Sequence, residues 1–74
     1  MKTIEVFKTN VADSRQTILL LQAIHQRFPG YIVNFDLHDC DRILRIESHT
    51  LQIINERIIA LLNEFGCFAE PLPD

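Results

Sequence analysis

The chain has 74 residues, of which 47% are hydrophobic, and its formal net charge is −3. This length allows one domain close to the lower limit for a single apolar core, so we expect residues 1–74 to form one domain. The hydrophobic content excludes a disordered segment, and the negative charge argues against nucleic-acid binding, which needs clustered Lys and Arg. The apolar runs are far shorter than the roughly 20 residues that span a bilayer, and no signal segment is recognisable. We therefore expect a cytoplasmic protein with no membrane partner.

The chain begins with a predicted strand, which is followed by a helix. Residues 3–8 alternate in the manner of a half-buried strand, and we expect Ile4 and Val6 to face the core and Phe7 to lie on the opposite, uncovered side. Asp13 has the side chain of a typical helix N-cap. A single apolar stripe with helical spacing then predicts the first helix: Thr17, Leu20, Leu21, Ile24 and Phe28.

The middle of the chain predicts two further strands joined by a hairpin. Alternation over residues 31–38, and again over residues 42–47, marks the two strands, and the polar segment 39–41 forms the turn. In the third strand we expect Leu44 and Ile46 to face the core.

The last part of the chain predicts a second helix and a final strand. Ser48 or Thr50 is a suitable N-cap, and the stripe of this helix is Leu51, Ile54, Ile58, Leu61 and Phe65. Gly66 is expected to adopt a positive φ after the helix. Residues 67–72 form the last strand, and Pro71 restricts it to an edge of the sheet because proline has no N–H to donate.

This order of elements, βαββαβ, predicts an α+β domain of the ferredoxin-like type. The two helices would cover one face of a four-stranded antiparallel sheet with strand order 4-1-3-2, which gives a two-layer sandwich. In this arrangement the loop 10–13, the hairpin 38–41 and the turn 65–67 meet at one end of the sheet. Functional residues are therefore expected at that end and on the uncovered face of the sheet.

Three short segments carry a resemblance to a known family: Phe7-Lys8-Thr9-Asn10-Val11-Ala12-Asp13, Phe35-Asp36-Leu37 and Gly66-Cys67-Phe68-Ala69. Over nearly all of its length, the chain resembles the heavy-metal-associated (HMA) domain of copper chaperones and P-type ATPase N-termini. In that family the first strand ends in GMTCxxC, and the two Cys bind Cu(I) or a similar soft ion. Here Thr9 matches the motif threonine, whereas Asn10 and Asp13 stand at the two Cys positions.

The replacement of both Cys residues changes the chemistry that the resemblance implies. Cu(I) prefers thiolates, whereas an amide and a carboxylate supply hard oxygen donors, so we expect neither a metal nor another cofactor. The two Cys elsewhere in the chain are expected to be free thiols of a reducing compartment. The alternative is a Cu or Zn carrier that uses Cys67 with the cluster at 38–41. Its candidate ligands are Cys67, Cys40, His38 and Asp13.

We do not expect an enzyme, because the chain has neither a Gly-rich phosphate loop nor a nucleophile spaced to meet a base. Exposed apolar groups on an open sheet face mark interaction sites, and an exposed strand edge can pair with another copy of itself. We therefore expect a small binding or adaptor module that associates with a protein partner or with itself. The predicted interaction surface consists of Phe7, Asn10, Asp13, Ile32, Ile43 and Arg45. A second alternative is an ACT-like regulatory domain that binds a small ligand.

Overall fold

The computed structural model describes residues 2–38, 40–49 and 52–73. Within these ranges the elements follow the order βαββαβ. The strands are β1 (Thr3–Thr9), β2 (Ile32–Asp36), β3 (Ile43–Ser48) and β4 (Ala69–Pro71), and the helices are α1 (Ser14–Arg27) and α2 (Asn55–Glu64). Neither helix is long and apolar enough to cross a bilayer.

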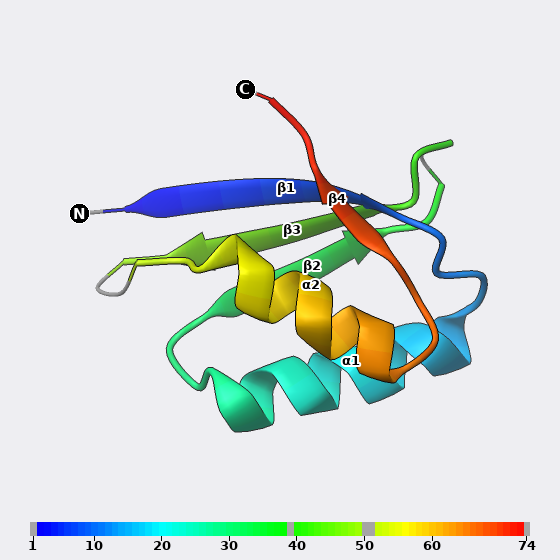
Figure 1. Cartoon of the computed structure of the whole chain (residues 1–74), viewed down its shortest axis with the longest axis horizontal. Coiled ribbons are helices and arrows are strands. Elements are labelled where there is room, and N and C mark those ends of the chain that lie inside the picture. Colours follow the sequence, from blue (N-terminus) through cyan, green and yellow to red (C-terminus); the bar gives the residue numbers. More distant parts are fainter. Residues whose placement is uncertain (1, 39, 50–51, 74) are drawn as a thin grey trace.

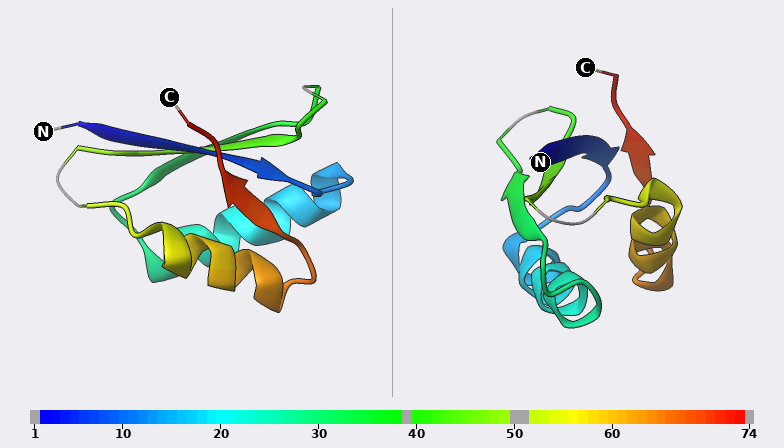
Figure 2. Two further views of the ribbon diagram at one scale, coloured as in Figure 1. Left: turned by 45° about the horizontal axis from the view of Figure 1, so that its top comes forward. Right: turned by 90° about the vertical axis from the view of Figure 1, so that its left-hand side faces the viewer.

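The strands form one antiparallel sheet in the order β2-β3-β1-β4, which is 4-1-3-2 when it is read from the β4 edge. β1 pairs with both β3 and β4, and β3 also pairs with β2. Both helices lie on the same side of the sheet, as Figure 1 and the left view of Figure 2 show. The prediction of an α+β domain with two helices and a four-stranded antiparallel sheet is confirmed. In the described part of the chain, no element covers the other face of the sheet.

α1 begins at the predicted place because Asp13 caps it. The backbone of Asp13 is extended, and its Oδ1 accepts the N–H of Gln16 at 3.0 Å. The side chain of Gln16 reaches back to the N–H of Ala12 at 2.7 Å, one residue earlier than in a standard capping box. Leu20 and Ile24 of the predicted stripe are buried against the sheet.

The core lies between the helices and the sheet, and both inward residues predicted for β3 are confirmed. Leu44 and Ile46 are fully buried. They pack among the largest fully buried apolar side chains, which are Phe7, Leu20, Ile24, Ile58, Leu61, Leu62 and Val11. At one end of the core the rings of Phe28 and Tyr31 stack with their centroids 5.0 Å apart.

The side of β1 that faces the core differs from the prediction. Phe7 is 0% exposed and faces the helices, whereas Ile4 and Val6 are half-buried on the uncovered side. Residues directly opposite in an antiparallel pair share a face, and Phe7 lies opposite the core residue Leu44. Alternation alone could not decide this, because both sides of β1 carry apolar side chains. The prediction that Phe7 belongs to an exposed interaction surface is therefore wrong.

The start of α2 also differs from the prediction. Ser48 does not cap the helix, because it is the last residue of β3 and is buried. The alternative cap, Thr50, lies with Leu51 outside the described residues. α2 begins at Asn55, after the N-cap residue Ile54, whose side chain makes no capping hydrogen bond.

The apolar stripe of α2 is confirmed only in the middle of the helix. Ile58 and Leu61 are buried as predicted, but Ile54 is 39% exposed and Phe65 is 41% exposed. Ile53 is buried in place of its neighbour Ile54. Helical spacing fails at Ile54 because residues 52–54 are not helical, and it fails at Phe65 because α2 ends at Glu64.

The turn after α2 and the position of β4 agree with the prediction. Gly66 has a φ of 76°, which is unfavourable for residues with a Cβ atom. The N–H of Cys67 donates to the carbonyl of Leu62 at 3.0 Å and closes the turn. β4 pairs only with β1, so Pro71 lies at a sheet edge as predicted.

Replacement of Phe7 tests the corrected orientation of β1. We expect Phe7→Ala to lower the free energy of unfolding by about 3–5 kcal/mol, because it leaves a cavity in the core. Phe68→Ala is the matched control, since Phe68 is 44% exposed, and it should cost less than about 1 kcal/mol. Urea denaturation measures both, and Phe7→Leu supplies a folded variant if Phe7→Ala does not fold. Equal losses for Phe7→Ala and Phe68→Ala would contradict the burial of Phe7.

Candidate functional site

Two hydrogen bonds tie the end of β1 and the loop after it to the other connections at this end of the sheet. Asn10 Oδ1 accepts the N–H of Phe68, just beyond the α2–β4 turn, at 2.8 Å. The N–H of Thr9 donates to the carbonyl of Asp41, in the β2–β3 hairpin, at 3.1 Å. The prediction that the loop 10–13 meets the hairpin and the turn is therefore confirmed.

The hydroxyl of Thr9 is the polar centre of this end. Thr9 is buried, and its Oγ1 donates to the carbonyl of Arg42 at 2.6 Å and accepts the N–H of Val11 at 3.2 Å. Arg42 has a φ of 47°, a conformation that is uncommon for a residue other than glycine, and this explains why β3 begins at Ile43 rather than one residue earlier. Its Nη1 donates to the carbonyls of Val11 and Ala12 at 3.3 and 3.4 Å. Arg42 thus joins the hairpin to the loop through both its backbone and its side chain.

The two residues that stand at the motif Cys positions have structural roles. The carboxylate of Asp13 accepts a backbone N–H as the N-cap of α1, and the amide oxygen of Asn10 accepts the backbone N–H of Phe68. Each of these candidate donors is therefore already used within the fold. Both residues are exposed, as expected for members of the predicted surface.

The two thiols lie in different environments. Cys67 is 5% exposed, and its Sγ lies 3.5 Å from Nε2 of Gln16 and 3.8 Å from the carbonyl oxygen of Phe65. Burial raises the pKa of the Cys67 thiol, so its thiolate fraction at neutral pH is lower than that of a free cysteine. Cys40 is exposed.

The predicted alternative metal ligands do not form a site in the described part of the chain. Among these residues no group of three or more His, Cys, Asp or Glu side chains could hold a metal ion. His38 is exposed, and its backbone N–H donates to Oδ1 of Asp36 at 3.1 Å. Asp39, which belongs to the cluster at 38–41, lies outside the described residues.

The uncovered face of the sheet carries interleaved apolar and charged side chains. We call it the open face, and its residues on the three longer strands are Ile4, Val6, Lys8, Ile32, Asn34, Asp36, Ile43, Arg45 and Glu47. The strand register places Arg45 between Val6 and Asn34. Of the predicted surface residues, Ile32 and Arg45 are exposed and Ile43 is half-buried. Sequence analysis missed Ile4 and Val6 as members of this face, because it assigned them to the core.

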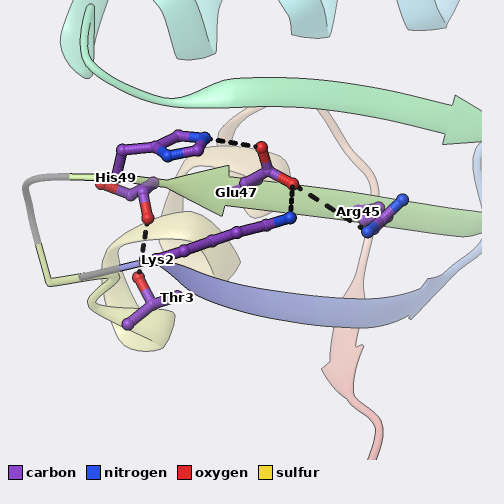
Figure 3. Close-up of polar contacts among 6 residues, drawn as sticks. Lys2, Thr3, Arg45, Glu47 and His49 are labelled. Atoms are coloured by element: carbon purple, nitrogen blue, oxygen red, sulfur yellow. Dashed lines mark hydrogen bonds and ion pairs between the residues drawn. The ribbon is translucent and has the colours of Figure 1, made fainter.

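Glu47 is the electrostatic centre of the open face. Its carboxylate lies 2.9 Å from Nε2 of His49, 3.5 Å from Nζ of Lys2 and 4.0 Å from Nη2 of Arg45 (Figure 3). The hydrogen bond from His49, with the charge of Lys2, holds the pKa of Glu47 below its ordinary value of 4.5, although desolvation opposes the shift. The sequence places Glu47 on the outward side of the third strand, but Glu47 was not among the residues of the predicted interaction surface. The available signal was the alternate spacing of Arg45, Glu47 and His49, which projects their side chains to one face of a strand.

Two hollows lie between the helices. The smaller one, of about 50 Å³, is lined by Gln16, Leu19, Leu20, Phe65 and Cys67. This volume is far below the roughly 300 Å³ at which sites for drug-sized ligands begin. A wider hollow of about 370 Å³ is lined by Arg27, Phe28, Arg57 and Ala60. Its Arg27 is already held by both carboxylate oxygens of Glu64, at 2.8 and 2.9 Å.

No family model, curated protein or solved structure matches this chain. The function must therefore be inferred from the open face and from the loop end, by which we mean the end of the sheet where the loop 10–13, the β2–β3 hairpin and the α2–β4 turn meet.

Two replacements of Asn10 test the bond between the loop and the approach to β4. We expect Asn10→Ala to lower the free energy of unfolding by about 1 kcal/mol, because the N–H of Phe68 loses its acceptor. Asn10→Asp retains an oxygen at the same position and should stay within about 0.5 kcal/mol of the parent chain. Urea denaturation at pH 7 measures both variants. Equal losses would show that the amide oxygen does not stabilise this end.

The pH dependence of stability tests the environment of Glu47. Because the folded pKa of Glu47 is below 4.5, its contribution is complete above pH 4.5 and is lost as the pH falls through the folded value. We therefore expect Glu47→Gln to differ from the parent chain most at pH 6–7, and the difference to shrink toward pH 3. Urea denaturation across this range is the measurement, with Glu70→Gln as an exposed control. A difference that stays constant with pH would contradict the lowered pKa.

Proposed function

We propose that the chain is a small non-enzymatic protein-association module that is ferredoxin-like in its strand order and HMA-like in its first loop. The proposed module does not transfer soft metal ions. The observation that carries the proposal is the open face, where aliphatic side chains alternate with charges and no described element covers them. Two free thiols fit a protein of a reducing compartment, such as the cytoplasm.

The composition of the open face supports a protein partner. Ile4 and Val6 are neighbours on β1, and the register joins each of them to a charged residue of β3, Glu47 and Arg45 respectively. Ile32 follows on the far side of Glu47 and is 47% exposed. Apolar side chains on an uncovered face with polar groups around them are typical of a protein-interaction surface, whereas small-molecule sites are concave pockets.

The loop end supports association rather than metal transport. The oxygens of Asn10 and Asp13 accept backbone N–H groups, so a metal ion would have to displace contacts of the fold. Cys67 would have to leave a buried position and lose a proton from a thiol whose pKa is raised. The Cu or Zn carrier is therefore the less favoured function.

The proposal is tested by site-specific photo-crosslinking in the cells that produce the chain. A photoreactive amino acid is introduced at Ile32 or Arg45 on the open face, and at the exposed residues Gln26 of α1 or Arg57 of α2 as controls. We expect discrete adducts of defined mass from the two open-face positions, at yields several times those of the controls. Mass spectrometry identifies whether the attached protein is a different chain or a second copy.

The decisive comparison is between the adduct yields of the open-face positions and those of the control positions. Equal yields from the open face and from the two helix controls, or adducts without a defined mass, would contradict the proposed association function. Circular dichroism of each labelled chain shows that the fold is kept.

A further inference from the structure

We propose that the β2 edge of the sheet binds a second copy of this chain, through antiparallel pairing of β2 with β2 of the second copy. In this pairing Phe35 lies opposite Phe35 of the second copy, and Asn34 lies opposite Asp36 of the second copy. The inference rests on the proposed association function and places a second copy at the edge beside the open face, which stays uncovered in this pairing.

The two edges of the sheet differ in their capacity to accept another strand. β4 carries Pro71, which has no N–H to donate, and covers only three residues. β2 covers five residues from Ile32 to Asp36, and it has neither a proline nor a lysine. Proteins normally use such residues to block pairing at an exposed edge. β2 is therefore the edge at which a further strand can be added.

Charge complementarity selects a second copy in one register. Within the sheet Arg45 lies opposite Asn34. In the proposed pairing, Asp36 of the second copy lies on the other side of Asn34. It is therefore in the same cross-strand row as Arg45. Asp36 forms no ion pair with the described residues, and the ion pair of Arg45 with Glu47 is long, at 4.0 Å. Asn34 lies between the two, so the long side chain of Arg45 would reach Asp36 of the second copy across one strand, and twofold symmetry repeats this pair.

The neighbouring registers lack this match. A shift of two residues places Asn34 opposite Asn34 of the second copy, and Asp36 then lies opposite the apolar Ile32. A shift of two more residues moves Asp36 past Tyr31 of the second copy, so Asp36 then has no opposite residue in β2 of that copy. The register centred on Phe35 also aligns the two phenyl rings, which are half-buried on the helix side. Aromatic pairs across strands add to the stability of a sheet.

The flank of α1 beside this edge is apolar. Gln16 and Arg27 contact Cys67 and Glu64, so their side of α1 faces α2 and the turn that follows it. At 100° per residue, Leu21 and Ile18 lie on the opposite flank, toward β2. Leu21 is half-buried and Ile18 is 55% exposed. α1 begins at the end of the sheet where β2 terminates, so this flank runs past Phe35 and would meet its equivalent in the second copy.

Analytical ultracentrifugation of the purified chain over a concentration series tests the inference. We expect a dimer of about 17 kDa, twice the 8.6 kDa of the chain. Ile18→Lys should weaken the dimer by about tenfold or more, because it places two like charges in an apolar contact. Leu19→Lys is a matched control, since Leu19 is an adjacent residue of α1, is 54% exposed and lies on the flank that faces α2. It should leave the dimer unchanged.

A charge exchange tests the register. Arg45→Glu and Asp36→Lys should each weaken the dimer by about three- to tenfold, and the double variant should restore most of the loss, because the opposite charges face each other again. Arg57→Glu makes the same charge change on α2 and should have no effect. Circular dichroism confirms that each variant is folded.

Three outcomes overturn the inference: a monomer at every concentration, a dimer that Ile18→Lys and Leu19→Lys weaken equally, or no restoration in the double variant. Its failure is distinct from that of the association function. A monomeric chain that still yields open-face adducts with a different protein keeps the function and rejects the second copy.

Discussion

The rest of the structure depends on β1, because this strand pairs on both of its sides and also ends at the polar centre of the loop. It lies between β3 and β4, and the N–H and hydroxyl of Thr9 bind the carbonyls of Asp41 and Arg42 in the hairpin. Phe7 fills the core opposite Leu44. One strand therefore sets the position of the hairpin, the sheet edge at β4 and the face that the helices cover.

This arrangement uses the polar groups of the loop end for the fold and leaves the open face for other partners. Asn10, Asp13 and Thr9 accept backbone N–H groups in their own chain, so this end is held by hydrogen bonds. The open face instead carries side chains that remain available for contacts with a partner, among them the exposed Ile32 and Arg45, whose ion pair with Glu47 is long. The two edges of the sheet also differ, because proline blocks strand pairing at β4 and no such residue blocks it at β2.

The amino-acid sequence by itself determined those features that depend on local stereochemistry. Asp13 caps α1 because its short carboxylate reaches the N–H three residues later. Gly66 takes the positive φ that ends α2, and Pro71 lies on an edge strand because it has no N–H. The alternation that buries Leu44 and Ile46 is likewise visible in the sequence. These signals extend over a few residues, and together they were enough to predict the order of elements and the ends that meet.

Tertiary structure decided whatever depends on residues far apart in the sequence. Phe7 is in the core, and Ile4 and Val6 are on the open face, because pairing with β3 sets which side of β1 the helices cover. The cations around Glu47 include Lys2, which the pairing of β1 with β3 brings near it. No pattern within one segment contains this information, since register and packing arise only when the strands and helices are assembled. The sequence therefore indicated where a candidate site lies, and only the assembled sheet decided which side chains form it.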